Sequence, residues 1–556
     1  MLMINYSTNS IIKRILLTLS SVVWMYLLNS SSELYSQDAG KYIKVGGSIN
    51  LSDNFYSSSG IDRRQPANVA RGIFRTTFTI LDEIQLPFEL YLSSQERKFQ
   101  QPFNQFGVSP RISNWLTLHA GYFSSKISDY TFGDLRMLGG GFELTPGKFR
   151  LKALYGRSKI ATEGSSVNNY PAVYKQIAYA ASIGYGGEGG TYFSLNLFHA
   201  KDDTSSIKND SLALPPAENL VGALRFGSQI VEALNIQSEV AVSAYSSNIK
   251  AERIKDLSFP EFFFTPNASS RVDGAAKIQI TLKPSNLWSL RFNAQWIGPG
   301  FNTLGYSLMT NDLMEFSLSP SMRLLENKLT LRLQAGVRYN NLRNNRISKT
   351  SRFTGSFNAS WQVSQAFGLD LNFNNNQITS GHKNDTLRLS NVFNSFMLSP
   401  RFTFEALGGN NSLNLNYSYQ NSIDKNIITS QASANKTHSA GVVHTLSLPS
   451  TLNFTTSINF NRSITSLIKP QILSISENVG RRFLNNNLNI SLGGGINFIK
   501  AASNDSHIFF NLNTNYSFGK YGNLGFVLTN NNYNTDSEFT KSFKELYGSL
   551  QYNIAF

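Results

Sequence analysis

The sequence predicts an all-β protein: a single large closed antiparallel transmembrane β-barrel of about 26 strands, with about 24 as the alternative. Segments along the whole chain alternate apolar and polar residues with a period of two, which gives each strand one apolar face. Only 15% of the 556 residues are charged although 41% are hydrophobic, which suits strands that face lipid and water in turn. Short turns alternate with longer polar connections, as in barrels with short periplasmic turns and long extracellular loops.

The last segment, Lys544–Phe556, predicts how the barrel closes. From Leu546 every second residue is apolar or small, and mostly polar residues lie between them. The last strand of a membrane barrel must pair with the first, so that no edge stays open, and its outer face must meet lipid. The segment resembles the closing strands of Gram-negative outer-membrane proteins, which commonly end in Phe. That resemblance implies the barrel-assembly machinery as a partner.

The chain is expected to begin with a secretory signal peptide, residues 1–36. Two basic residues precede the apolar run Ile15–Leu28, and small and polar residues follow it. We expect cleavage after Ser36, with Ser32 as the alternative. Residues 37–556 are then one outer-membrane β-barrel domain without an N-terminal plug, because the first strand is expected to start near Lys41 and leaves no room for one. No later run reaches the ~20 apolar residues of a membrane-spanning helix.

Turn signals divide the chain into hairpins with unequal ends. Ile508–Phe518 is a clear alternating run, and the first strand is expected to start near Lys41. Short connections are expected at 82–83, 113–114, 146–147, 187–190, 231–232, 283–286, 325–327, 364–366, 406–410, 449–450, 485–487 and 519–521. Longer polar connections are expected around 53–69, 125–134, 158–174, 201–217, 249–270, 298–310, 341–349, 379–390 and 534–541. Trp115, Trp288 and Trp361 lie beside short connections, which predicts an aromatic girdle at the periplasmic side.

Two stretches, Gln95–Arg157 and Trp296–Pro320, are unusually rich in Gly and Pro. Such density within strands indicates bends, bulges or close backbone approach. Their phrases, MLGGGFELTPGKFRLKALYGR and WIGPGFNTLG among them, resemble those of porin-like outer-membrane β-barrel proteins of the Bacteroidota. The resemblance implies a barrel fold and a location in the cell outer membrane. No functional residue is assigned in that group, so none is carried over.

The formal net charge of +15 leaves two interpretations open. Basic loops can face the anionic headgroups of outer-membrane lipid and lipopolysaccharide, or the lumen can be biased toward anionic solutes. The basic residues are dispersed along the chain, which argues against nucleic-acid binding. Because the sequence holds no cysteine, we expect no disulfide, thiolate metal site or lipid-modified cysteine.

No motif for catalysis or metal binding stands out. The sequence holds no GxSxG and no HExxH motif. His438 and His444 share a face of one expected strand but lie ~20 Å apart, too far to hold one metal ion. His119 is expected to point into the lumen with Thr117. We therefore expect no enzymatic activity, no catalytic or cofactor-binding residue, no cofactor and no metal.

Two functions remain open for such a barrel. The first is a porin-like channel for small solutes, anionic ones included, because a barrel of about 26 strands encloses a wide lumen. That lumen must be narrowed by inward-folded loops, by side chains or by a lumen-plugging protein, and the candidate loops lie near 53–69, 158–174, 201–217 and 249–270. The second is a structural or accessory barrel for secretion, envelope assembly or lipid export, whose lumen a partner protein fills.

Overall fold

The computed structural model describes residues 43–556 apart from 95–104, 134, 165–169, 188, 209–212, 255–259, 261–262, 382–383, 427, 431–433 and 467. The expected signal peptide and its cleavage site lie outside the described residues. Within these ranges, no helix has the length and apolar character needed to cross a membrane.

Nearly all regular structure in the described residues is β-strand. The first strands are β1 (Ile43–Ser59), β2 (Asn68–Ile80), β3 (Ile84–Ser93), β4 (Gln105–Val108), β5 (Arg111–Ile112), β6 (Leu116–Phe123), β7 (Met137–Leu144), β8 (Phe149–Lys159), β9 (Lys175–Gly186), β10 (Tyr192–Asp203), β11 (Glu218–Val231), β12 (Leu234–Ser246), β13 (Ser270–Leu282) and β14 (Trp288–Ile297). The others are β15 (Leu313–Leu324), β16 (Leu329–Asn340), β17 (Lys349–Gln362), β18 (Phe367–Gly381), β19 (Ser390–Ala406), β20 (Gly409–Asp424), β21 (Asn435–Ser447), β22 (Leu452–Thr465), β23 (Gln471–Phe483), β24 (Leu488–Lys500), β25 (Asn504–Ser517), β26 (Asn523–Thr535) and β27 (Phe543–Ala555). In the described part of the chain, two short 3-10 helices, η3 (Asp385–Leu387) and η4 (Gly519–Tyr521), lie in connections.

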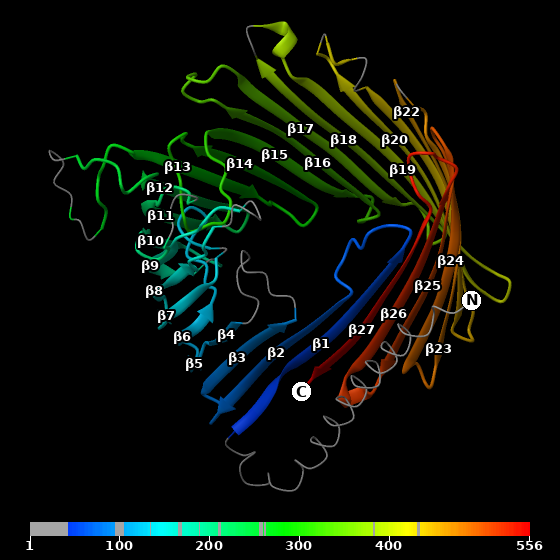
Figure 1. Ribbon diagram of the computed structural model, residues 1–556, viewed down its shortest axis with the longest axis horizontal. Coiled ribbons are helices and arrows are strands. Elements are labelled where there is room, and N and C mark those ends of the chain that lie inside the picture. Colours follow the sequence, from blue (N-terminus) through cyan, green and yellow to red (C-terminus); the bar gives the residue numbers. More distant parts are fainter. Residues whose placement is uncertain are drawn as a thin grey trace.

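The strands form one closed antiparallel barrel of 26 strand positions. Each strand pairs with the strands next to it along the chain, with β4 and β5 together taking one position. The last strand, β27, pairs with β1 from Ser48↔Ala555 to Ser59↔Lys544. Figure 1 shows the ring, with β1 in blue beside β27 in red. The predicted closure of the final segment onto the first strand is confirmed.

One of the 26 positions is divided between β4 and β5. Both pair with β3 on one side and β6 on the other. Ser109 and Pro110 separate them, and proline lacks the N–H that a ladder needs. A Cβ atom on Gly107 would lie 1.9 Å from the carbonyl oxygen of Tyr122, so the backbones approach too closely there for any residue except glycine. The irregularity predicted for residues 95–157 is therefore real at this strand.

Each predicted short connection falls at or overlaps a junction between two strands. In the tightest turns successive residues take positive φ, as in Leu325, Glu326 and Asn327 (51°, 54° and 69°), which matches the twist of the strands they join. The first of the long connections is much shorter than predicted. The first loop, expected over 53–69, narrows to residues 60–67 because β1 continues to Ser59, where β27 supplies its ladder of backbone hydrogen bonds.

The outer face of the barrel carries the apolar rows of the alternation. Ile508 and Phe510 on β25 are each 45% exposed, while Asn511 and Asn513 lie on the opposite face. Trp115, Trp288 and Trp361 are exposed large side chains beside short turns, as the predicted girdle requires.

One carboxylate interrupts this apolar outer face at the middle of a strand. Glu477 lies on β23 between Ile475 and Val479, on their face of the strand, and is exposed. Its Oε2 accepts a hydrogen bond of 2.6 Å from Oγ1 of Thr456, its partner on β22. Opposite it on β24 stands Gly494, which leaves the carboxylate uncovered on that side.

Candidate functional site within the lumen

Part of the inner wall is apolar where a water-filled barrel would be polar. The inward side chains of β9 to β13 include a row of small buried residues: Ala178, Ala180, Ala200, Ala223, Ala241 and Ala275. On the same strands the alternate residues, such as Leu195, Leu224 and Val240, are about half exposed on the outer face. The residues that cover these alanines therefore lie inside the barrel.

Two connections of the chain itself cover this wall. The β6–β7 segment (residues 124–133) and the β14–β15 segment (residues 298–312), together called the inner segments, fold inward from the rim. Their aromatic side chains Tyr130, Phe132 and Phe301 are almost completely buried, at 1%, 0% and 0% exposure. Phe132 stacks on Phe198 of β10, with ring centroids 5.6 Å apart. The inner segments therefore pack against this apolar patch of the wall.

The inner segments hold each other through their backbones. Phe132 and Gly305 form a parallel β-bridge, and the N–H of Gly133 donates to the carbonyl oxygen of Gly305 at 3.2 Å. Thr303 Oγ1 donates to the carbonyl of Thr131 at 2.7 Å. A Cβ on residue 305 would lie 2.0 Å from the Thr131 oxygen. Glycine is therefore required at this contact, because any larger residue would separate the two backbones.

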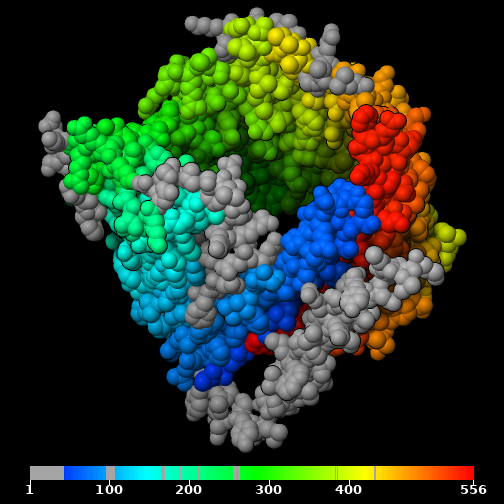
Figure 2. Space-filling model, in the orientation of Figure 1, coloured from blue at the N-terminus to red at the C-terminus, as the bar shows by residue number. Residues whose placement is uncertain are grey.

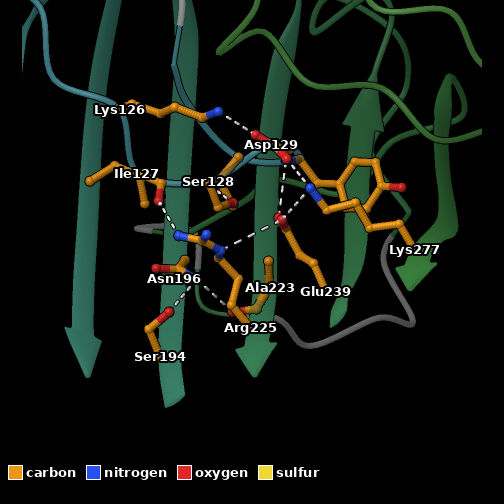
Figure 3. A network of polar contacts seen from close by, with 12 residues as sticks. Lys126, Ile127, Ser128, Asp129, Ser194, Asn196, Ala223, Arg225, Glu239 and Lys277 are labelled. Atoms are coloured by element: carbon orange, nitrogen blue, oxygen red, sulfur yellow. Dashed lines mark hydrogen bonds and ion pairs between the residues drawn. The ribbon is translucent and has the colours of Figure 1, made fainter. Parts of the chain in front are cut away.

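Charged groups tie the β6–β7 segment to the wall near the middle of the strands (Figure 3). The backbone N–H of Tyr130 donates to Glu239 Oε1 of β12 at 3.1 Å. The same carboxylate lies 3.4 Å from Lys277 Nζ of β13 and 3.9 Å from Arg225 Nε of β11. Lys277 also pairs with Asp129 of the segment. Because its side chain is fully buried, Glu239 needs these cations to stay charged.

The β14–β15 segment is fixed to the same strands by neutral hydrogen bonds. The carbonyl of Asn302 accepts from Ser243 Oγ of β12 at 2.5 Å and from Asn219 Nδ2 of β11 at 3.0 Å. The N–H of Leu304 donates to Asn219 Oδ1 at 3.0 Å. Both inner segments therefore narrow the lumen from one side, and the anchor at Glu239 lies halfway along β12.

A cavity of about 330 Å³ adjoins the β6–β7 segment on the inner wall of β7 to β11. Its lining holds four cationic side chains, from Lys126, Arg150, Lys152 and Arg225, and one carboxylate, Glu143. Glu143 lies 3.0 Å from Lys152 Nζ and 3.2 Å from Nε2 of His119, a residue on the inner face of β6. The excess of cations gives this part of the narrowing a positive potential, which attracts anions.

The histidines considered in the sequence have separate surroundings. His119 points into the lumen as predicted, and its Nδ1 lies 2.9 Å from Ser109 Oγ. His438 and His444 both belong to β21, where His438 Nδ1 contacts Tyr417 Oη at 3.0 Å and His444 Nε2 contacts Asn411 Oδ1 at 2.9 Å. In the described ranges, no group of three His, Asp or Glu side chains is placed to hold a metal ion.

The inner segments differ from the four loops that the sequence favoured for narrowing the lumen. The loop at 249–270 instead reaches the buried carboxylate of Glu218, which the N–H of Thr265 contacts at 3.4 Å. Glu218 pairs with Lys201 at 3.1 Å, on the opposite face of β10 from the buried Ala200. The signal for the true segments was the density of Gly and Pro in 95–157 and 296–320, which contain them.

The chain matches no known family profile and no curated protein sequence. Among solved structures it is similar to OccAB2 of Acinetobacter baumannii, with 13% identity over 71% of this chain and 100% of that one and a TM-score of 0.30. It is similar to the outer-membrane protein OpdK of Pseudomonas aeruginosa, with 9% identity, 68% and 99% coverage and a TM-score of 0.31. It is also similar to the iron transporter FrpB of Neisseria meningitidis, with 11% identity, 93% and 83% coverage and a TM-score of 0.36. At TM-scores below 0.5, we infer nothing about this chain's solute from these likenesses.

Proposed function

We propose that this protein is a porin-like channel of the Gram-negative outer membrane that conducts small solutes and favours anions. The outer membrane is inferred from the barrel itself: its outer rows are apolar, its turns carry exposed tryptophans, and closure leaves no strand edge to pair with water or other chains. Its expected neighbours there are lipid and lipopolysaccharide.

The observation that carries the channel proposal is that the chain narrows its own lumen. An empty barrel of this width would breach the membrane's permeability barrier, and an accessory barrel relies on a bound partner to prevent this. Here the inner segments occupy part of the lumen near mid-height and bury Tyr130, Phe132 and Phe301 against the wall. Figure 2 shows the molecule still hollowed at its centre, between the blue β1–β2 hairpin and the green strands.

The remaining inner wall is suited to water. On β22 to β25 the inward row consists mainly of Asn, Ser and Thr, with pairs such as Asn459↔Ser474 and Asn497↔His507. Such uncharged polar groups hydrate a pore without trapping an ion. With a positively charged narrowing beside them, they favour a weakly selective passage for anions.

Conductance in planar lipid bilayers tests the proposal directly. The purified protein is expected to form steady pores, and a salt gradient is expected to give a reversal potential on the anion-selective side. Protein that inserts as a folded barrel but passes no current, and that co-purifies with a second protein, would instead establish the accessory barrel with a filled lumen.

A further inference from the structure

A second polar cavity, of about 390 Å³, lies on the inner face of β13 to β17, away from the inner segments. Its charged lining residues are two arginines, Arg291 of β14 and Arg332 of β16. The polar groups around them are hydroxyls and amides, among them those of Ser319, Ser321 and Asn358. No carboxylate belongs to the lining.

The strand register brings the two arginines to the same place. Arg291 is directly opposite Ser319, and Arg332 is directly opposite Ser321, so the arginines flank β15 from its two sides. Residues opposite each other in an antiparallel pair point to the same face of the sheet. Both arginine side chains therefore lie on the same inner face as the two serines.

Neither guanidinium has an anionic partner among the residues that the structure describes. Arg338, on the same face of β16, donates to Glu315 Oε2 at 2.8 Å. Nearby, Arg343 pairs with Asp273 at 2.7 Å and Arg346 with Asp312 at 3.2 Å. Arg291 and Arg332 take part in no such pair in the described ranges. Two unneutralised guanidinium forks beside hydroxyl donors match the geometry of a bound phosphate or carboxylate group.

We propose that Arg291 and Arg332 form an oxyanion-binding site in the lumen, which takes the phosphate or carboxylate group of a small solute. The inference deepens the proposed channel function, since it names the chemical class of the solute. The site lies toward the short-turn ends of β14 to β16, whereas the inner segments fold in from the other rim. A solute entering from the long-loop side passes the narrowing first and reaches this site afterwards.

Equilibrium dialysis of the detergent-purified barrel against radiolabelled inorganic phosphate, and separately against succinate, tests the site at low ionic strength. Wild-type protein should bind at least one of the two saturably, and the one it binds identifies the group. Arg332→Gln should weaken that binding by at least about tenfold, the loss expected for one charge-assisted hydrogen-bonded partner.

Arg338→Gln is the matched control, because it removes the same charge from the same face of the same strand while leaving the cavity intact. It should change the affinity by no more than about twofold. A shift of unheated samples on denaturing gels shows that each variant is a folded barrel. Absence of saturable binding to wild type, or equal weakening by both variants, would overturn the proposal. Because the readout needs no current, its failure is distinct from failure of the channel.

Discussion

Replacing Gly305 by alanine is expected to detach the inner segments from each other and widen the pore. The added Cβ would lie 2.0 Å from the carbonyl oxygen of Thr131 and 2.9 Å from Cα of Phe132, and neither backbone atom can move aside like a flexible side chain. The contact must then open. Three hydrogen bonds depend on it: Gly133 to the residue 305 carbonyl, Thr303 to Thr131, and Tyr306 Oη to Ser128.

The size of the effect follows from those bonds. At about 0.5–1.5 kcal/mol each, their loss weakens the closed arrangement by about 1.5–4.5 kcal/mol. Since every 1.4 kcal/mol is tenfold, the population with separated segments should rise by roughly 10-fold to 1,000-fold. The barrel wall should remain folded, because its ladder does not include residue 305.

Two assays report the detachment. Single-channel recordings should show a larger or more frequently flickering conductance than wild type. Limited trypsin digestion of the folded barrel should cleave faster at Lys126, which lies within the β6–β7 segment, and this readout does not depend on conduction. Gly222→Ala is the control, since a Cβ at this β11 position meets no atom within 4 Å. Unchanged conductance and unchanged cleavage in a folded Gly305→Ala barrel would refute the account of the narrowing.

Three further tests, which use four substitutions, address other parts of the structure. Lys277→Met removes one of the cations that pair with the buried carboxylate of Glu239, at a cost of about 3–5 kcal/mol. Trypsin should then cleave the β6–β7 segment faster than in wild type. Unchanged cleavage would contradict the role of Glu239 in anchoring that segment. Leu492→Arg, on the outer face, should lower the stability of the barrel in lipid by about 2–4 kcal/mol. Asn513→Arg, on the inner face, should lower it by much less. Equal losses of stability in guanidinium unfolding would refute the assignment of the two faces. Glu477→Leu should raise the unfolding midpoint in the same assay, because it removes a charge from the apolar face. A lower midpoint would show that the hydrogen bond from Thr456 stabilises the barrel by more than the exposed charge costs.

Strands, turns and closure were predictable because they depend on local patterns. Alternation sets which side chains share a face, and a one-residue error would turn an entire strand over, so runs such as Ile508–Phe518 allow only one arrangement. The residues at which strands begin and end were harder to predict. β1, for example, continues to Ser59, into the connection expected over 53–69, because β27 pairs with it there.

The narrowing of the lumen was harder to predict, since it depends on contacts between segments about 170 residues apart. The hydrogen bond from Thr303 to Thr131 spans 172 positions. No local sequence pattern around either residue indicates that the two segments contact each other. Glycine density marked both regions as unusual, but its meaning at Gly305 is visible only when the opposing backbone is in place. Likewise, Arg291 and Arg332 are two separate basic residues in the sequence. Only the pairing register of β14, β15 and β16 shows that they lie on either side of the same two serines.

The pairing of β1 with β27 also constrains how the molecule can be made. Tyr547 Oη donates to Asn54 Oδ1 across this junction, although the two residues are 493 positions apart. An intermediate that lacks β27 leaves one edge of β1 unpaired, because β2 pairs only with the other edge. Contacts this distant in sequence also form slowly. A nascent sheet would meanwhile present two unpaired margins to lipid, where each exposed N–H and C=O is costly. We therefore expect assembly of this protein to depend on a surface that covers both margins until the ring is complete.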